Sequence, residues 1–453
     1  MLNYSNRKRA FRLSPPQTLA LGFIVIILIG SVIFATPSSN TNGEALPFLD
    51  AMFIAASAAC VTGLSVINVG MDFTTLGQVS LMVLIQVGGL GFTTMATLIA
   101  IVLRRRISFR ERLILQEAMN QTTLEGIIPL IKKVMVYSLV IEAVGAILLA
   151  SRFMTEMPVG RALYFGLFHS ISIFNNAGFD LFGMYPDRSA SLIDYAQDPF
   201  ISIVSMILIV LGGLGFIVLS DLITYRQNKR LTLHSKVVLA ASAGLIVFGT
   251  IIIFIFEYSN PNTMQPLSFT HKLLNAMMQS VSSRSAGVST VDIGELRQAT
   301  QFAIMLLMFV GAAPGSTGGG IKVTTLVVLI FAVIAMLRGR EDVVLFRRRL
   351  DQDRIHKAIT FTLLSFFLIV IATMVLTTTE SAPFLPIMFE VTSAFATAGM
   401  STGITDQFSS FGKAFLIVLM FVGRLGPVTL AFALARKPEK DKFRRPEGRI
   451  TIG

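Results

Sequence analysis

The chain has 453 residues, of which 53% are hydrophobic and only 14% charged, and its mean hydropathy is +0.71. A water-soluble domain of this length carries far more charge, which excludes a soluble enzyme or binding module. The formal net charge of +12 would suit a nucleic-acid-binding protein, but most lysines and arginines lie in five clusters between or beyond apolar segments. By the positive-inside rule these clusters mark the cytoplasmic side of a membrane and indicate no nucleic-acid partner. The clusters are 7–12, 104–133, 226–236, 338–357 and 436–449.

Apolar segments follow one another in groups of three, each group lying between two basic clusters. Two segments of each group are long enough to cross about 30 Å of hydrocarbon, and the one between them is too short and suits a re-entrant helix. In chain order the groups are 18–34, 46–59 and 75–103; 134–150, 162–174 and 200–220; 237–256, 273–283 and 302–337; and 358–379, 384–395 and 414–435. We therefore predict an all-α polytopic membrane protein with eight membrane-spanning helices in a lipid bilayer.

The groups define four tandem repeats, at 1–105, 106–227, 228–340 and 341–436, followed by a cytoplasmic tail at 437–453. Their pore loops are predicted at 46–65, 162–180, 273–289 and 384–401. Because each repeat crosses the membrane twice, all four share one orientation, and both ends of the chain are cytoplasmic. Repeats of one orientation can surround a single pore with pseudo-fourfold symmetry, whereas an inverted-repeat carrier needs opposite orientations.

A small polar patch with a central glycine follows each short segment. The glycines are Gly63, Gly178, Gly287 and Gly399, which are 115, 109 and 112 residues apart. A registered signal in four copies indicates an internal repeat. The predicted filter residues are Val61, Thr62, Gly63, Asn176, Ala177, Gly178, Ser285, Ala286, Gly287, Thr397, Ala398 and Gly399.

These patches have the chemistry of a cation filter. A cation that enters a membrane sheds water, and inward-pointing backbone carbonyls can replace the lost ligands. Glycine permits the backbone dihedrals that this needs, and non-helical backbone is tolerated at membrane depth where it lines a polar cavity. The preceding re-entrant helix also directs its negative dipole end toward the cation.

A second glycine motif recurs in the last long segment of each repeat, as Gly88-Gly89-Leu90-Gly91, Gly212-Gly213-Leu214-Gly215, Gly311-Ala312 and Gly423-Arg424-Leu425-Gly426. The first two resemble a dinucleotide fingerprint, but no strand precedes them and they lie at membrane depth. We interpret them as packing glycines inside continuous helices.

An intramembrane gate is predicted at 311–320, where five glycines and Pro314 fall within ten residues and cannot continue a helix. A passive kink is the alternative interpretation. Arg424 would either repel cations at the pore axis or form a structural ion pair. Lys322 would either neutralise a carboxylate or extend toward the cytoplasm. The predicted gate residues are Gly311, Pro314, Gly315, Gly318, Gly319, Gly320, Lys322 and Arg424.

Two polar residues occupy matching positions on re-entrant helices, since His169 and Glu390 both precede their filter glycine by nine residues. We expect them to pack and hydrogen-bond behind the filter. His169 has no metal-ligand partners at useful spacing, and no cluster of catalytic residues supports an enzyme.

The sequence resembles the Trk/Ktr/HKT superfamily of potassium transporters over essentially its whole length, most closely the membrane subunits of Ktr systems. The residues that carry the resemblance are Val61-Thr62-Gly63-Leu64, Phe174-Asn175-Asn176-Ala177-Gly178-Phe179, 311–322 and Val422-Gly423-Arg424-Leu425-Gly426-Pro427. Glycine in every repeat goes with K⁺ preference in that family. With one glycine per repeat and no full Thr-Val-Gly-Tyr-Gly signature, the stringency of selection and the number of ion sites stay open.

The resemblance implies a pore-forming subunit of a bacterial potassium uptake system in the plasma (inner) membrane, with Na⁺ as a candidate activator. It also implies a homodimer that rests on a cytoplasmic octameric ring of RCK subunits of the KtrA/KtrC type, which would bind the regulatory nucleotide. A secondary active symporter that couples K⁺ to Na⁺ or H⁺ has the same fold and stays open as the alternative.

Overall fold

The computed structural model describes residues 14–103, 107–118, 127–184, 191–427 and 429–430. The predicted tail at 437–453, the basic clusters at 7–12 and 436–449, and part of the cluster at 104–133 lie outside these residues. The described part is a bundle of α-helices with one two-residue hairpin, formed by β1 (Val344–Leu345) and β2 (Arg348–Arg349).

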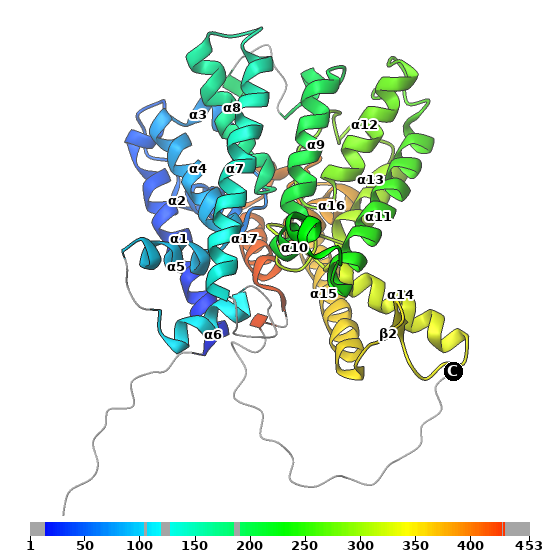
Figure 1. The fold of residues 1–453 in the computed structure, drawn as a ribbon. Helices are drawn as coiled ribbons and strands as arrows, with labels where there is room; N and C mark the ends of the chain where they lie inside the picture. The colour runs from blue at the N-terminus through cyan, green and yellow to red at the C-terminus, as the bar shows by residue number, and fades with distance from the viewer. Residues whose placement is uncertain (1–13, 104–106, 119–126, 185–190, 428, 431–453) are drawn as a thin grey trace, which may run out of the picture.

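A long apolar helix opens each predicted repeat (Figure 1). These helices are α1 (Pro15–Ala35), α7 (Ile127–Phe153), α11 (Leu233–Glu257) and α15 (Gln352–Thr379). Their starts follow local rules: Ser14 and Gln17 form a capping box before α1, and Thr232 caps α11. Many of their large apolar side chains are exposed, as on Val32, Ile147 and Ile255. Exposed apolar surface of this extent suits contact with lipid.

The short helices lie inside the bundle, where nearly every residue in their second halves is buried. They are α2 (Phe48–Cys60), α8 (Val159–Phe174), α12 (Phe269–Ser282) and α16 (Phe384–Ala396). Each begins and ends within four residues of its predicted segment, because the flanking prolines, serine and glycine patch are visible in the sequence.

The last helix of each predicted repeat is interrupted. The pieces are α4 (Thr75–Leu90) and α5 (Phe92–Val102); α9 (Pro199–Gly213) and α10 (Phe216–Asn228); α13 (Gln298–Phe309) and α14 (Val323–Leu337); and α17 (Ser410–Leu425). The smaller elements are α3 (Val69–Asp72), α6 (Phe109–Ala118) and the 3-10 turns Pro37–Ser39, Phe182–Met184, Ile193–Tyr195 and Thr405–Gln407.

The interruptions correct the prediction that the second glycine motif lies inside continuous helices. The last glycine of the motif, Gly91, Gly215 or Gly426, has φ of +82°, +85° or +84°. Gly91 and Gly426 directly follow the ends of α4 and α17, and Gly215 directly precedes α10. Helical dihedrals are negative, and glycine takes these values without steric cost. Pro314 occupies this position in the third repeat.

Within the described residues, four helices are long and apolar enough to cross a membrane, or five if the pair α9 and α10, bent by 102°, counts as one span. The expectation of eight spans stays a prediction, since the interrupted helices are individually shorter.

The end of the bundle packs against its beginning. α17 contacts α2, and Lys413 Nζ on α17 lies 2.8 Å from Asp50 Oδ1 on α2. The last predicted repeat therefore closes against the first.

Candidate functional site

The four predicted filter glycines meet in a closed ring. Their φ values are +96° at Gly63, +73° at Gly178, +71° at Gly287 and +78° at Gly399. A Cβ atom on each would lie less than 3.0 Å from a backbone carbonyl oxygen of the next repeat. Those carbonyls belong to Ala177, Ala286, Ala398 and Thr62, in that order, so the contacts pass through all four predicted repeats and return to the first. Both the positive φ and the lack of room for a Cβ atom require glycine at these positions.

The backbone turns sharply where three of the short helices end. Val61, Asn176 and Thr397, each two residues before its glycine, are left-handed, with φ of 57°, 59° and 49°. The next amide bonds back to a serine carbonyl five residues earlier: Thr62 to Ser57 (2.7 Å), Ala177 to Ser172 (2.7 Å) and Ala398 to Ser393 (2.9 Å). In the third repeat Ala286 bonds four residues back, to Ser282 (2.9 Å), and no left-handed residue precedes Gly287.

Serine hydroxyls hold two of these turns. The Gly63 amide donates to Ser57 Oγ (3.0 Å), and Ser172 Oγ donates to the Phe179 carbonyl (2.6 Å). Ser393 occupies the matching position in the fourth repeat, and its hydroxyl has no hydrogen-bond partner in the described part of the chain. Our sequence reading missed these serines, although the shared spacing of six residues before the glycine would have revealed them.

His169 and Glu390 anchor the segments that follow the filter, as expected of residues behind it. The His169 ring accepts from the Leu181 amide through Nε2 (3.3 Å) when Nδ1 donates to the Phe165 carbonyl (2.7 Å). Glu390 accepts from the Thr402 amide (2.9 Å). Both amides lie three residues after a filter glycine, so two different side chains perform one positioning task.

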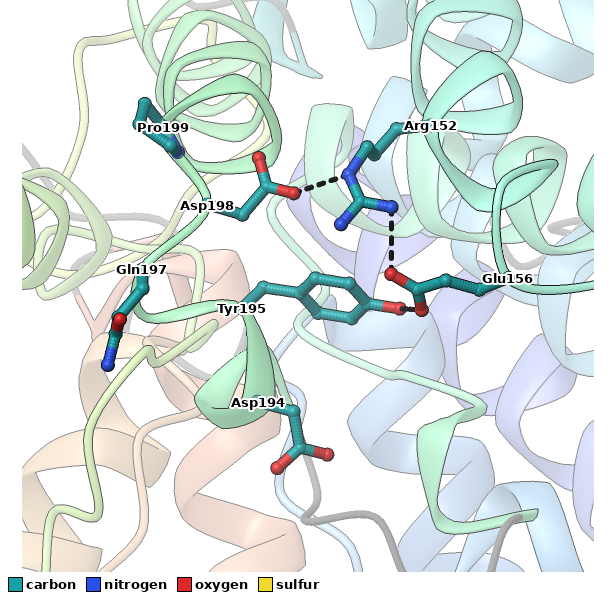
Figure 2. Close-up of a pocket in the computed structure, with 7 residues that line it drawn as sticks. All are labelled: Arg152, Glu156, Asp194, Tyr195, Gln197, Asp198 and Pro199. Atoms are coloured by element: carbon teal, nitrogen blue, oxygen red, sulfur yellow. Dashed lines mark hydrogen bonds and ion pairs between the residues drawn. The ribbon is translucent and has the colours of Figure 1, made fainter.

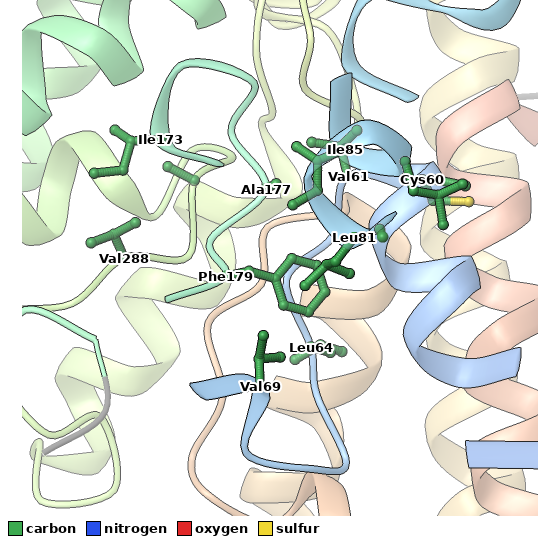
Figure 3. Close-up of a cluster of buried hydrophobic side chains, with 14 of the residues drawn as sticks. Cys60, Val61, Leu64, Val69, Leu81, Ile85, Ile173, Ala177, Phe179 and Val288 are labelled. Atoms are coloured by element: carbon green, nitrogen blue, oxygen red, sulfur yellow. The ribbon is translucent and has the colours of Figure 1, made fainter. Parts of the chain in front are cut away.

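Apolar side chains pack around the irregular segments 61–65, 176–179, 285–289 and 397–401, which contain the predicted filter glycines and are called the filter strands below. Leu64, Val69 and Phe179, which come from the first and second repeats, gather next to the strand of Ala177 in Figure 3 and are almost fully buried. Such packing limits the movement of backbone that has no regular hydrogen-bond ladder.

An open cavity of about 720 Å³ lies on the side of the ring lined by residues that follow the glycines. All four filter glycines reach it, together with Asp72, Asp180, Asp292 and Asp406, one from each predicted repeat. No lysine or arginine of the described chain lines this cavity. Ionised carboxylates there would raise the local concentration of cations.

The loop between α13 and α14 lies on the other side of the ring, against residues that precede the glycines. It docks on the break between α9 and α10. Amides of Ala313 and Thr317 donate to the Gly213 and Gly212 carbonyls (3.0 and 3.4 Å), and the Phe216 amide donates to the Gly315 carbonyl (3.1 Å). Helix ends leave such groups without partners, so the loop satisfies the broken helix at membrane depth.

Arg424 connects α17 with two other elements. Its guanidinium donates to the carbonyls of Thr317 in the loop and of Gly88 and Gly89 at the end of α4. Lys322 Nζ donates to the Gly318 carbonyl (2.6 Å) within the loop. Within the described residues neither side chain forms an ion pair with a carboxylate.

The predicted gate residues divide into two groups. Gly318 and Gly319 lie against predicted filter residues: a Cβ on Gly318 would lie 2.7 Å from Ser285 Cβ, and one on Gly319 would collide with Thr397 Oγ1. Gly311 packs against Gly319, and Gly320 has a positive φ of +70° next to Gly311. Pro314 and Gly315 instead face the break at Gly215.

Sequence reasoning missed two buried polar groups near the filter. Glu142 on α7 accepts from Gln86 (3.0 Å) and Asn175 (3.1 Å) and has no basic partner in the described chain. Among the described residues, Arg284 on the loop after α12 hydrogen-bonds to Ser242 alone, at 3.3 and 3.4 Å. An ionisable residue inside an apolar segment would have been a usable signal.

A second cavity, of about 700 Å³, lies between the ends of α7 and α9 (Figure 2). Arg152 there pairs with Glu156 (2.7 Å) and Asp198 (2.6 Å), and Tyr195 donates to Glu156 (2.9 Å). Because these side chains bond the end of α7 to the segment that leads into α9, we interpret them as a structural link.

Comparison with known proteins gives a consistent result. Residues 16–445 match the family model described as TrkH, cation transport protein. The chain is 42% identical to Ktr system potassium uptake protein B of Bacillus subtilis, covering 98% of this chain and 97% of that protein. It is 38% identical to potassium/sodium uptake protein NtpJ of Enterococcus hirae, with 98% of each covered. The crystal structure of the potassium transporter TrkH from Vibrio parahaemolyticus has the same fold, with a TM-score of 0.73 at 19% identity over 95% of this chain and 87% of that one.

Proposed function

We propose that this chain, which belongs to the TrkH family of cation transport proteins, is the pore-forming subunit of a bacterial potassium uptake system. The observation that carries the proposal is the closed ring, in which each filter glycine abuts a backbone carbonyl of the next repeat. Carbonyl oxygens at one level around an axis can replace the water ligands of K⁺. The names of the two relatives, both potassium uptake proteins, agree with this ion.

The proposed architecture has four repeats, at 1–105, 106–227, 228–340 and 341–436, arranged with pseudo-fourfold symmetry around one pore. Counting each interrupted helix as one crossing gives eight spans with cytoplasmic ends. The ring order of the glycine contacts and the closure of α17 on α2 support this arrangement. The acidic cavity would then be the outer vestibule, and the loop at 311–320 would lie in the inner half of the pathway.

The loop and Arg424 form the proposed gate. The loop lies against the filter, and Arg424 holds it from the opposite helix. A permanent cation at this place opposes the passage of K⁺ until the loop moves. We further propose a homodimer that rests on a cytoplasmic octameric ring of RCK subunits, which would bind nucleotide and control the loop, with Na⁺ as an activator.

Uptake in a bacterium that lacks its own K⁺ systems tests the function. We expect the wild-type chain, expressed with its cytoplasmic subunits, to restore growth and ⁸⁶Rb⁺ uptake at limiting K⁺. Absence of uptake by a correctly inserted chain under both high and low Na⁺ would contradict the proposal.

A symporter that couples K⁺ to Na⁺ is the second candidate, favoured by the name of the Enterococcus relative, potassium/sodium uptake protein. K⁺ accumulation in vesicles beyond its electrochemical equilibrium would establish coupling. Accumulation that stops at equilibrium would establish passive conduction.

A further inference from the structure

Three consecutive residues of the loop lie under three of the four filter strands. Thr317, Gly318 and Gly319 contact Asn176, Ser285 and Thr397 in that order. Each of these partners lies two residues before its filter glycine, so the loop touches the same position in three repeats. The loop thus packs directly against three of the filter strands.

One of these contacts differs from the others in chemistry. Asn176 Nδ2 donates to Thr317 Oγ1 at 2.8 Å, and both side chains are fully buried. Among the described residues it is the one side-chain hydrogen bond between the loop and the filter strands. The residues that match Asn176 in the other predicted repeats are Val61, Ser285 and Thr397, and none of them has a side-chain amide that could donate such a hydrogen bond.

The hydroxyl, amide and carbonyl groups of Thr317 all form further hydrogen bonds. Its hydroxyl donates to the Gly212 carbonyl (3.2 Å), its amide approaches the same oxygen (3.4 Å), and its carbonyl accepts from Arg424. It therefore connects the filter strand of the second repeat, the break after α9, and α17. A displacement of the loop cannot leave Asn176 unchanged, because the amide would lose its buried partner.

We propose that Thr317 and Asn176 are a positioning pair that couples the loop to the filter, so that the position of the loop sets ion selectivity as well as the rate of passage. This inference rests on the proposed filter and gate. Asn176 has φ of 59° and is two residues from Gly178, so a change at its side chain acts directly on the filter backbone. With the loop seated, the pair holds the second filter strand in its selective geometry.

The test measures K⁺ and Na⁺ uptake rates for Thr317→Val, Asn176→Gly and the double variant, in the full chain with its cytoplasmic subunits. Glycine keeps the positive φ at position 176 without strain. Because the Thr317 hydroxyl also bonds to the Gly212 carbonyl, the double-mutant cycle is needed to isolate the bond to Asn176. Thr317→Ser keeps the hydroxyl, and Ser316→Ala removes a hydroxyl that donates to the Ala313 carbonyl within the loop.

We expect Thr317→Val to lower the K⁺/Na⁺ uptake ratio about fivefold or more, since a buried donor loses its partner. In the Asn176→Gly background Thr317→Val should have no further effect on this ratio, and Thr317→Ser and Ser316→Ala should keep the wild-type ratio. The proposal is overturned if Thr317→Val changes the uptake rate but not the ratio, if Thr317→Ser behaves as Thr317→Val, or if the two single effects on the ratio add. A Gly178→Ser variant measured in parallel distinguishes failure of the coupling proposal from failure of the filter proposal. A changed K⁺/Na⁺ ratio in Gly178→Ser supports the filter even when the coupling test fails. An unchanged ratio in Gly178→Ser contradicts the filter assignment itself.

Discussion

The guanidinium of Arg424 on α17 donates a hydrogen bond to the backbone carbonyl of Thr317, more than a hundred residues earlier in the chain. The same guanidinium reaches the Gly89 carbonyl (3.2 Å), so one side chain joins the loop to two of the interrupted helices. In the proposed pore this side chain holds the loop closed and places a positive charge beneath the filter.

Replacement of Arg424 by alanine should therefore open the pathway. A hydrogen bond from a charged group contributes about 1.5–3 kcal/mol. Its loss would shift the equilibrium between closed and open loop by about 10- to 150-fold toward the open state. We expect Arg424→Ala to raise K⁺ uptake without nucleotide, as measured by ⁸⁶Rb⁺ flux into vesicles. Arg424→Lys, which keeps the charge and loses the planar fork, should be intermediate. Unchanged or reduced flux in correctly folded Arg424→Ala would contradict the gate.

The glycines at the helix breaks provide a matched pair. Gly91 and Gly215 share one backbone conformation, but a Cβ on Gly91 meets nothing closer than 3.9 Å, whereas one on Gly215 lies 2.7 Å from the Pro314 carbonyl of the loop. We expect Gly91→Ala to lower the free energy of unfolding by about 1–3 kcal/mol through the unfavourable backbone conformation alone. Gly215→Ala should lower it further and also alter K⁺ uptake, because it displaces the loop. Thermal unfolding in detergent and uptake check both effects, and equal behaviour of the two variants would be inconsistent with the docked loop.

The serines that precede the filter should differ in importance. Ser57 and Ser172 bond to filter backbone, and Ser393 has no partner in the described residues. Loss of one such hydrogen bond is worth about 0.5–1.5 kcal/mol, which corresponds to a change of about two- to tenfold in the K⁺/Na⁺ uptake ratio. We expect this change in Ser57→Ala and Ser172→Ala and none in Ser393→Ala. A change in Ser393→Ala as large as in the other two would show that the hydrogen bonds are not the cause.

The ion pair between Lys413 and Asp50 joins the fourth predicted repeat to the first, and both side chains are mostly buried, at 16% and 22% exposure. Loss of one partner should lower the free energy of unfolding by an amount between the roughly 1 kcal/mol of an exposed pair and the roughly 3–5 kcal/mol of a buried pair. We expect Asp50→Asn and Lys413→Met each to lower the unfolding temperature, with the double variant no worse than the poorer single one. Additive losses would mean that the two side chains act independently.

Much of the helical plan was predictable, because apolar periodicity and length mark the long helices, and the recurring glycine patches mark the ends of the short ones. The interruptions at Gly91, Gly215 and Gly426 were not predicted. Apolar residues continue on both sides of each break, and hydropathy does not distinguish a bent helix from a straight one. The shared motif carried the signal, since the same glycine recurs at the same place, but its dihedral is visible only in the structure.

The site was predictable only in part for a similar reason. Four registered glycines indicate a common role, yet the ring of carbonyl contacts depends on how the repeats meet. Thr317 illustrates the limit: it is one polar residue among many glycines in its segment, and its partners Asn176, Gly212 and Arg424 lie about one hundred residues or more away. No local pattern encodes contacts of that separation.

The K⁺/Na⁺ preference of Gly178→Ser tests the central claim most directly. A side chain at Gly178 would lie 2.6 Å from the Ala286 carbonyl and would require a positive φ of +73° from serine. If the ring is the selectivity filter, the variant should insert in the membrane and show a K⁺/Na⁺ uptake ratio reduced by about tenfold or more, together with a weaker apparent affinity for K⁺. A correctly inserted Gly178→Ser chain with wild-type affinity and wild-type ratio would contradict the assignment of the four glycines as the filter.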